Sequence, residues 1–306
     1  MATILIAGAT GLIGKELQKT LGEHNTIRVL TRNKKLCSHT NIFYWNPTTM
    51  EISADAFASV DCIINLSGEN IGNKRWTTKQ KKRIQDSRIA STRTLVWGIE
   101  TYGTSVTTCI WGSAVGFYGN HTTNSCFTEE QPPGTDFMAR TCELWEAEAK
   151  RISNKNIRNI IIRTGVVLSN KGGMLTKITS TLPFRVLPLF GSGTNNIPWI
   201  HIDDLCSIVT YVLHQHHFQG TFNAVANNNS QLEFIKTIQH AYSKYTVIIP
   251  IPSVIVQILL GEMATIVLTG NTISNSKLID SGFTFSHNNL LTTLTQELNN
   301  GTDSKS

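Results

Sequence analysis

The sequence predicts an α/β protein built on a doubly wound parallel sheet, with a smaller C-terminal α/β domain. Through the first half of the chain, short apolar runs alternate with helical patterns. The first run, Thr3–Ala7, leads directly into a glycine-rich turn and a helical pattern over Ile13–Leu21. After Gly165 the alternation stops, and Phe184–Gly193 is rich in Pro and Gly. Repeated strand–helix units favour a parallel sheet, and the change after Gly165 indicates a second domain.

Continuous apolar runs are typical of parallel strands that are buried on both faces. Five runs predict strands, the last four each preceded by a helical stretch: Thr3–Ala7, Thr26–Leu30, Cys62–Leu66, Val106–Trp111 and Ile157–Arg163. An apolar helix is expected over Leu205–Leu213, and Gly220–Ala226 is expected to return as the last strand of the first domain. From Ser230 onward helices predominate, with one proline-interrupted strand near Val247–Pro252.

These elements predict a first domain over residues 1–165, to which residues 195–226 return. Residues 166–194 and 227–299 are expected to form the smaller domain, and the polar residues 300–306 a frayed tail. A chain of 306 residues, 40% of them apolar, can bury the core that either one large domain or two closely joined domains need.

Charge and cysteine usage exclude several classes of function. The net charge of +6 is modest, and no zinc-finger spacing, RNA-binding aromatic signature or long basic tail is present, so we expect no nucleic-acid partner. The six cysteines are scattered without a CxxC pair, and the chain starts in a strand without a basic leader. We therefore expect a reduced cytoplasmic protein.

One apolar segment, Ile248–Leu268, has the length of a membrane span. It contains two prolines near its start, together with Gln257 and Glu262. A span needs about 20 mostly apolar residues without a central charge. We therefore interpret the segment as one or two buried amphipathic helices and expect no membrane partner.

The glycine-rich turn has a spacing that suits a dinucleotide. Gly8 permits the tight turn, Gly11 lets the backbone approach a pyrophosphate, and Gly14 lets the helix pack closely on the sheet. The helix N-terminus then offers free N–H groups to the anion. We expect the whole turn, with Thr10, Leu12 and Ile13, to bind the cofactor; the alternative is a purely structural turn.

The end of the second predicted strand indicates which dinucleotide is bound. NAD-binding proteins carry an acidic residue there, roughly twenty residues past the glycines, for the ribose 2′-hydroxyl. This chain has Thr31-Arg32 at that place, with Lys34 and Lys35 nearby and no acid. Because a guanidinium can grip a 2′-phosphate through two hydrogen bonds, we predict NADPH rather than NADH. The alternative is that Arg32 is a solvated loop residue.

The chain also resembles a family. Its motifs are Gly8–Gly14, Ile64–Ile71, Arg75-Trp76, Asp86–Arg88, Ser113–Gly119, Trp145-Glu146, Arg163–Leu168, Trp199–Asp204 and Gly261–Ala264. They are similar to those of the extended, atypical short-chain dehydrogenases/reductases, and more narrowly of the NAD-dependent epimerase/dehydratase-like "epimerase family" proteins of the sugar-nucleotide epimerase-like branch. The resemblance covers about residues 3–299 and implies a Rossmann domain that binds NADP and a small C-terminal substrate domain. Some members are labelled cell-division inhibitors, but no residue here supports that activity.

The resemblance also implies roles for single residues. Leu66, Ser67 and Gly68 resemble the loop beside the adenosine and ribose, and Arg88 the arginine that faces the cofactor. Val166 resembles the residue that borders the nicotinamide. Two alternatives stay open: Asn65–Asn70 as a plain turn, and Arg88 as one cation on the solvated face of a basic helix.

The proton-transfer groups of the superfamily are missing. Its members use a Tyr followed four residues later by a Lys, which lowers the pKa of the phenol. Alignment on Glu146 puts Met138 at the Tyr position and Cys142 at the Lys position, and neither can replace that pair. Ser113 fits the position of the serine that holds the substrate oxygen.

Three substitutes are considered: Tyr118, the His201–Asp203 pair, and Cys142. For each, a structural role is the simpler alternative: a core phenol, a helix N-cap and an inert thiol, respectively. We hypothesise Ser113 and Tyr118 as the catalytic pair, and no metal ligands.

Two functions stay open. One is an NADP(H)-dependent oxidoreductase or epimerase-like enzyme acting on an unidentified small molecule. The other is a catalytically silent NADPH-binding protein with a structural, sensing or partner-binding role. For a substrate cleft, the candidate wall comprises Trp76, Leu182–Arg185, Gly191–Asn196 and Trp199, although both tryptophans could equally be packing residues. The helices before Ser113 and around Trp145 could form a homodimer interface or face solvent.

Overall fold

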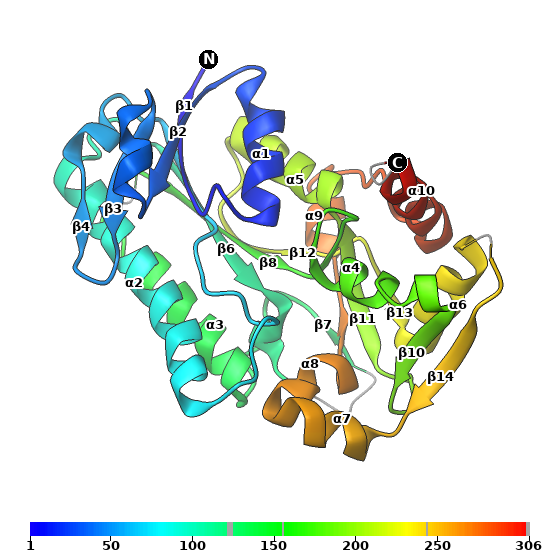
Figure 1. The fold of residues 1–306 in the computed structure, drawn as a ribbon. Helices are drawn as coiled ribbons and strands as arrows, with labels where there is room; N and C mark the ends of the chain where they lie inside the picture. Colours follow the sequence, from blue (N-terminus) through cyan, green and yellow to red (C-terminus); the bar gives the residue numbers. More distant parts are fainter. Residues whose placement is uncertain (121–124, 155, 243, 304–306) are drawn as a thin grey trace.

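A computed structural model describes residues 1–120, 125–154, 156–242 and 244–303. Its largest feature is an eight-stranded sheet in the order β12-β8-β6-β5-β1-β2-β3-β4, with helices on both faces (Figure 1). The strands are β1 (Thr3–Ala7), β2 (Thr26–Thr31), β3 (Ile42–Asn46), β4 (Glu51–Ile52), β5 (Cys62–Asn65), β6 (Thr108–Ala114), β8 (Arg158–Thr164) and β12 (Gly220–Ala224). All neighbours pair in parallel except β3 and β4. The predicted doubly wound parallel fold is therefore confirmed.

The sheet is apolar on both faces because successive strand residues point to opposite sides. Ile4 and Ile6 of β1 join a core that also contains Leu17 and Leu205. These two leucines lie on α1 (Leu12–Gly22) and α5 (Ile202–His214). The intervening strand residue Leu5 joins a second core with helices α2 (Thr78–Tyr102) and α3 (Phe137–Ala149). A continuous apolar strand is thus buried between two helical layers.

The chain order reverses beside β1. From β1 it passes outward to β2 and β3, and then returns to β5 on the other side of β1. In open α/β sheets, ligands bind outside the carboxyl ends of the strands at such a reversal. The turn after β1 and the segment after β5 therefore meet at the edge where a cofactor is expected.

The region between β2 and β5 differs from the sequence-based prediction. A helix was expected before Cys62, but the structure has only 3₁₀ turns there, at Lys34–Ser38 and Ala54–Phe57. Strands β3 and β4 were missed because Ile42–Asn46 mixes aromatic and polar residues and only one of its five residues is buried. An edge of the sheet carries a weaker apolar signal than its centre.

The remaining strands and helices, apart from those that cover the large sheet, form a smaller lobe (Figure 1). One sheet is β13 (Asn227–Ser230), β11 (Asn196–His201) and β9 (Val166–Leu168), and two pairs are β10 (Val186–Phe190) with β14 (Val247–Ile251) and β7 (Cys126–Phe127) with β15 (Thr272–Ile273). The helices are α4 (Gly173–Thr179), α6 (Gln231–Ala241), α7 (Ser253–Leu260), α8 (Thr265–Leu268), α9 (Ser276–Asp280) and α10 (Leu290–Asp303). Of segment 195–226, β12 lies in the large sheet and β11 in the three-stranded one.

Two expectations for the C-terminal part need correction. Residues 300–303, expected to fray, continue helix α10, while 304–306 lie outside the described residues. The segment 248–268 is broken into β14, α7, a 3₁₀ turn and α8, and most of the apolar side chains of α7 are exposed rather than buried. No helix in the described part of the chain combines the length and apolarity needed to cross a bilayer.

Gly14 controls how closely α1 approaches the sheet. A Cβ placed on Gly14 would lie 2.3 Å from the carbonyl oxygen of Gly8, which belongs to the backbone and has no room to move. We expect Gly14→Ala to lower the free energy of unfolding by about 3 kcal/mol, because the helix must shift off the sheet. Urea unfolding followed by circular dichroism measures this.

Gly22→Ala, at the other end of α1, is the matched control. Its added Cβ would make ordinary contact, 3.7 Å from Ile27 Cγ1. We expect stability unchanged or raised by about 0.5 kcal/mol. Equal losses in the two variants would contradict the proposed steric role of Gly14.

Candidate functional site

The turn between β1 and α1 has the geometry of an anion-binding loop. Gly8 has φ +86°, a left-handed conformation that glycine adopts freely, and its carbonyl accepts from the Gly11 N–H at 3.1 Å. Gly11 is the N-cap of α1 and provides no side-chain cap. The N–H groups of the first turn of α1 therefore have no side-chain acceptor at the cap and are left to bind an anion. Thr10 and Gly11 are exposed there, and Leu12 and Ile13 are half-buried.

The segment after β5 lies directly against this turn. The Leu66 N–H donates to the Ala7 carbonyl at 2.9 Å, and a Cβ on Gly8 would lie 2.7 Å from the Leu66 carbonyl carbon. In the next residue, the hydroxyl of Ser67 is buried and has no hydrogen-bond partner among the described residues. Because buried hydroxyls are almost always paired, this one fits a polar atom of a ligand in the site.

Arg88 reaches the same segment from α2. A Cβ on Gly68 would lie 3.0 Å from the guanidinium carbon of Arg88, so only glycine allows this contact. Its Nη1 donates to the carbonyls of Glu69 and Ile84, each at 3.0 Å, and the guanidinium lies 5.2 Å from the centre of the Trp145 ring. Burial lowers the pKa of Arg88. Arg88 is thus held against the loop after β5 rather than spread on a solvated face.

The residues predicted to bind the 2′-phosphate lie at the end of β2. Ala7 of β1 pairs with Leu30 of β2, which places Thr31 and Arg32 at the same edge as Gly8. Thr31 is buried and its hydroxyl accepts from the Asn33 N–H at 3.1 Å, whereas Arg32 is exposed. The Lys34 ammonium lies 4.5 Å over the Tyr44 ring. This corner is therefore basic.

Val166 begins strand β9, beyond Gly165. A Cβ on Gly165 would lie 2.6 Å from the Pro198 carbonyl oxygen, so glycine is needed where the chain leaves β8. Val166 is half-buried and pairs with Trp199 of β11.

Ser113 and Tyr118 belong to one buried polar network. The Ser113 hydroxyl donates to Glu146 Oε1 at 2.7 Å, and Arg163 donates to both oxygens of Glu146 at 2.8 and 2.9 Å. Arg163 Nη1 also donates to the Tyr118 hydroxyl at 3.0 Å, which in turn donates to Asn223 Oδ1 at 2.7 Å. The network joins residues of β6, α3, β8 and β12.

The environment of Tyr118 keeps its phenol protonated. Its side chain is 0% exposed, and burial raises the pKa of the hydroxyl, with Arg163 acting in the opposite sense. Ser113 is 5% exposed. The two hydroxyls are linked through Glu146 and Arg163, and both are engaged with protein groups.

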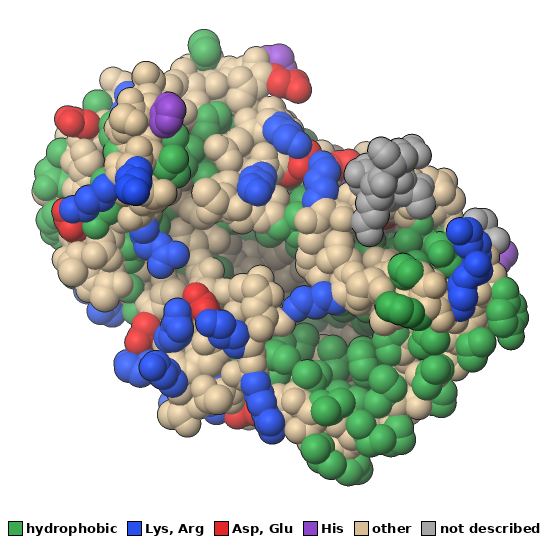
Figure 2. Space-filling model, in the orientation of Figure 1, with side chains coloured by type: hydrophobic (Ala, Val, Ile, Leu, Met, Phe, Trp, Pro, Cys, Tyr) green, Lys and Arg blue, Asp and Glu red, His purple; other side chains and the backbone are tan. Residues whose placement is uncertain are grey.

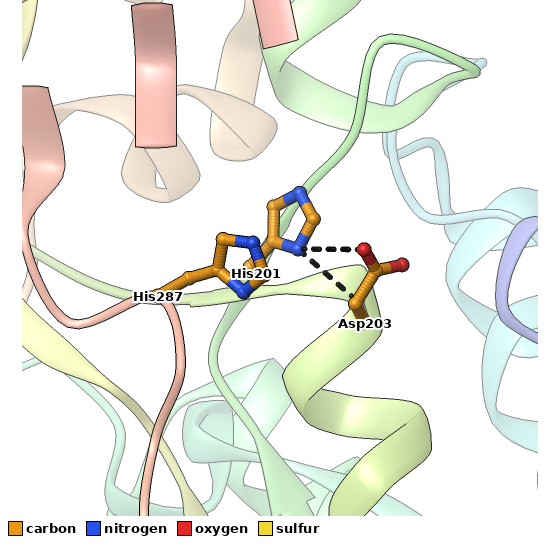
Figure 3. Close-up of side chains that lie close together, drawn as sticks. All are labelled: His201, Asp203 and His287. Carbon is orange, nitrogen blue, oxygen red and sulfur yellow. Dashed lines mark hydrogen bonds and ion pairs between the residues drawn. The ribbon is translucent and has the colours of Figure 1, made fainter. Parts of the chain in front are cut away.

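His201, Asp203 and His287 lie close together where α5 begins, as Figure 3 shows. Nδ1 of His201 accepts from the Asp203 N–H at 3.2 Å, while Nε2 lies 3.0 Å from Glu297 Oε1 and donates to it. The two imidazoles are stacked, with centroids 3.9 Å apart and planes 28° apart. A metal ion lies in the plane of its imidazole about 2 Å from the nitrogen, so stacked rings do not converge on one ion. We assign the cluster to packing of α5 against the segment before α10.

Comparison with known proteins identifies the family. Residues 4–224 match the NAD dependent epimerase/dehydratase family. The chain belongs to this family. Residues 251–297 match a second family, described as a domain of unknown function (DUF1731).

Relatives of this epimerase-family chain cover nearly its whole length. An epimerase family protein of Mycobacterium bovis is 32% identical over 293 residues, which are 94% of this chain and 95% of the relative. The crystal structure of human epimerase family protein SDR39U1 with NADPH is 29% identical, covers 97% of this chain and 99% of its own, and has a TM-score of 0.85. UDP-glucuronic acid 4-epimerase of Bacillus cereus, at 16% identity and a TM-score of 0.79, covers 99% of both chains and shares the fold.

In this epimerase-family chain, Met138 and Cys142, the two residues expected at the Tyr and Lys positions, both lie on α3. Met138 packs near Gly116, where an added Cβ would lie 3.5 Å from the Met138 Cβ. Cys142 is buried, and burial raises the pKa of its thiol to about 12. A thiol with that pKa is neither a nucleophile nor a source of positive charge at neutral pH.

Both tryptophans of the expected cleft wall are packing residues. Trp199 is 0% exposed and its Nε1 donates to Asn229 Oδ1 at 2.7 Å. Trp76 is buried against Phe137, with ring centroids 5.1 Å apart. In the segment Leu182–Arg185 of the expected wall, Leu182 is buried, whereas Pro183, Phe184 and Arg185 are exposed. Figure 2 nevertheless shows a hollow between the two lobes with Lys and Arg side chains around it.

Sequence reasoning missed the contacts that tie the segment after β5 to the smaller lobe. We call residues 66–77 the bridging loop. Lys177 of α4 donates to the Gly72 carbonyl, and Arg75 packs on Gly261, where an added Cβ would lie 2.9 Å from Arg75 Nε. Just beyond the loop, Lys81 pairs with Glu262 at 2.7 Å. The motifs Arg75-Trp76 and Gly261–Ala264 were noted in the sequence, but nothing in it indicated that they touch.

The environments of the cysteines predict which thiols react. Cys126 is exposed and Cys37 half-buried, whereas Cys62, Cys109, Cys142 and Cys206 are buried with raised pKa values. We expect a thiol-specific disulfide reagent at about pH 8 to label Cys37 and Cys126 in the folded chain and the four others only after unfolding. Mass spectrometry of the labelled peptides measures this. Labelling of Cys142 in the folded chain would contradict this prediction and make Cys142 a candidate reactive group again.

Proposed function

We propose that this chain binds NADPH at the carboxyl edge of β1, β2 and β5 and uses it in oxidoreductase or epimerase-like chemistry on a small molecule. The observation that carries the proposal is the convergence of three features at this edge. They are the glycine turn with its uncapped helix, the Ser67 hydroxyl, which has no partner in the described part of the chain, and Arg32 in place of an acid. The human relative solved with NADPH supports it.

Each part of the edge suits one part of the cofactor. The backbone of Gly8–Gly14 would hold the pyrophosphate at the helix N-terminus. Arg32 would pair with the 2′-phosphate, since a guanidinium matches a phosphate bidentately. The segment Leu66–Gly68 would border the ribose, with Arg88 fixing its position and Val166 lying towards the nicotinamide.

The chemistry would use groups at the carboxyl end of β6. Bound NADPH supplies a hydride. We propose Ser113 and Tyr118 as the pair that serves the proton transfer, with Ser113 orienting the substrate oxygen. Tyr118 is fully buried and hydrogen-bonded to Asn223 and Arg163. It would therefore take part in one of two ways: by contacting the substrate after a rearrangement that exposes its hydroxyl, or by positioning Arg163 and Glu146.

A second candidate function is a silent NADPH-binding protein that senses the cofactor or binds a partner. Met138 and Cys142 at the usual Tyr and Lys positions, and the burial of Tyr118, favour it. Turnover of NADPH in a screen of carbonyl compounds separates the two functions. The substrate, a cytoplasmic location and a homodimer through α2 and α3, which expose Trp97 and Leu144, stay proposals.

We expect the unmodified chain to prefer NADPH to NADH. Because a charge-assisted hydrogen bond is worth about 1.5–3 kcal/mol, Arg32→Ala should weaken NADPH binding about ten- to hundred-fold and leave NADH binding nearly unchanged. Isothermal titration calorimetry on chain freed of cofactor measures both dissociation constants.

Lys35→Ala removes an exposed cation three residues away and serves as the control for Arg32→Ala. We expect less than about a three-fold change in NADPH affinity, since an exposed cation that makes no direct contact with the phosphate acts through solvent, where salt screens it. A comparable loss in both variants would mean that general positive charge, not Arg32, selects the phosphate.

For the catalytic pair, we expect Ser113→Ala and Tyr118→Phe each to lower turnover at least about a hundred-fold, the typical contribution of a proton-transfer group. NADPH affinity should stay within about two-fold, because neither side chain lies at the pyrophosphate or 2′-phosphate end. Steady-state reduction of a carbonyl substrate found in the screen measures turnover.

Tyr211→Phe is the matched control for Tyr118→Phe, because its hydroxyl belongs to α5 and donates to the carbonyl of Ser281 at the end of α9, outside the Ser113 network. It should leave turnover unchanged. Full turnover by Tyr118→Phe would remove Tyr118 from the mechanism.

A further inference from the structure

Helix α7 exposes an apolar surface at the edge of the molecule. Val254, Ile258 and Leu259 are 62%, 67% and 66% exposed, and Val256 alone of its described residues is buried. Val247 and Ile249 continue the surface along β14, the strand that leads into α7. We call these residues together with Ile255 the apolar face. Figure 2 shows it as a continuous hydrophobic area in the lower right of the molecule.

Aromatic side chains end the apolar face at the far end of β14. Phe184 is 79% and Tyr245 82% exposed. The parallel pairing of Val186 with Val247 brings them together, and Arg185 Nη1 reaches the Tyr245 carbonyl at 3.4 Å. Monomeric soluble proteins rarely expose so many large apolar side chains in one place, and such patches mark interaction sites.

Positive charge flanks the apolar face at both ends. Residues 74–83 contain six Lys and Arg and no acid, and the contacts of Arg75 with Gly261 and Lys81 with Glu262 hold them beside the end of α7. At the other end, Arg185 and Lys244 are exposed next to the aromatic pair. Between residues 244 and 270 the one acidic side chain, Glu262, is paired with Lys81.

We propose that the apolar face docks this chain on the surface of an anionic phospholipid bilayer. An apolar helix flanked by Lys and Arg, with aromatic residues at its border, is the pattern of an element that lies in the membrane interface. The apolar side chains enter the acyl boundary, and the cations meet the lipid phosphates. The chain lies on the membrane and does not span it.

Charge complementarity favours a bilayer over a second copy of the chain. In a two-fold dimer built on this face, the same patch appears on both subunits. The basic flanks of one copy would then lie beside those of the other, and like charges repel. An anionic lipid surface instead neutralises both flanks. The proposal departs from the expectation of no membrane partner, which rested on the absence of a spanning segment.

The test is flotation of the full-length chain with vesicles of phosphatidylcholine alone, and with vesicles in which about a third of the lipid is phosphatidylglycerol. We expect binding to the anionic vesicles only, weakening several-fold at high ionic strength because salt screens the charges. No binding to either, or equal binding to both, overturns the proposal.

Variants test the apolar residues and the basic residues of this surface separately. The double change Ile258→Asp with Leu259→Asp should lower the partition coefficient about a hundred-fold, since two apolar side chains no longer enter the lipid. Lys74→Glu with Lys79→Glu should lower it at least about ten-fold. Ile279→Asp, a half-exposed apolar residue on α9, is the matched control and should bind like the unmodified chain.

Two further measurements test whether each variant is folded and whether the chain associates with itself. The thermal midpoint of each variant shows that it is folded, which we expect because the replaced side chains are mostly exposed. Sedimentation without lipid reports self-association. Association that the Ile258→Asp with Leu259→Asp change abolishes, in a chain that does not float with vesicles, would assign the face to a second copy and overturn the proposal.

Discussion

The ion pair between Arg163 and Glu146 is the interaction on which the centre of the molecule depends. Both side chains are almost fully buried, so each charge relies on the other and on neutral hydrogen-bond partners, with Lys150 as a second and more distant cation 4.0 Å from Glu146. Arg163 extends from β8 and Glu146 from α3, and through Ser113, Tyr118 and Asn223 they fix β6, the 3₁₀ turn that follows it, and β12. Among the described residues Arg163 has no other ion-pair partner, so removing Glu146 would leave a buried charge unpaired, which costs about 3–5 kcal/mol. The carboxyl end of β6, where the chemistry is expected, therefore has a rigid base.

This network also limits the chemical roles that the hydroxyls of Ser113 and Tyr118 can have. Ser113 was singled out because it fits the position of the superfamily's serine, and Tyr118 because it lies near Ser113 in the sequence and could substitute for the missing tyrosine. In the structure they are joined through charged groups, and the phenol is sealed from solvent. The guanidinium of Arg163 donates to the phenol and also neutralises Glu146. Both hydroxyls are thus held by one buried ion pair.

The sequence was most informative where one local rule determines the structure. Gly8, Gly11 and Gly14 follow a continuous apolar strand, and their backbone geometry depends only on neighbours in the chain and on the next strand. The strand β3, near the edge of the sheet, was missed because its residues are only partly buried and apolar and polar residues do not alternate clearly along it. Contacts such as Tyr118 with Asn223, or Arg75 with Gly261, join residues more than a hundred positions apart, and no local pattern carries them. The exposure of α7 was missed for the same reason, since an apolar helix is normally buried and only the tertiary structure leaves this one uncovered.

The bridging loop connects the two lobes through weak, exposed contacts. A carbonyl of Gly72, the packing of Arg75 on Gly261 and the neighbouring Lys81–Glu262 pair are all at the surface, and an exposed ion pair contributes only about 0–1 kcal/mol. One hydrophobic core, by contrast, runs from Ile4 and Ile6 of the large sheet to Trp199 and Phe234 of the smaller lobe and joins the two lobes. Detachment of the bridging loop from the smaller lobe should therefore cost much less than separation of the lobes through this core. Because the loop is held partly by the neighbouring Lys81–Glu262 pair, its detachment should become easier as ionic strength rises.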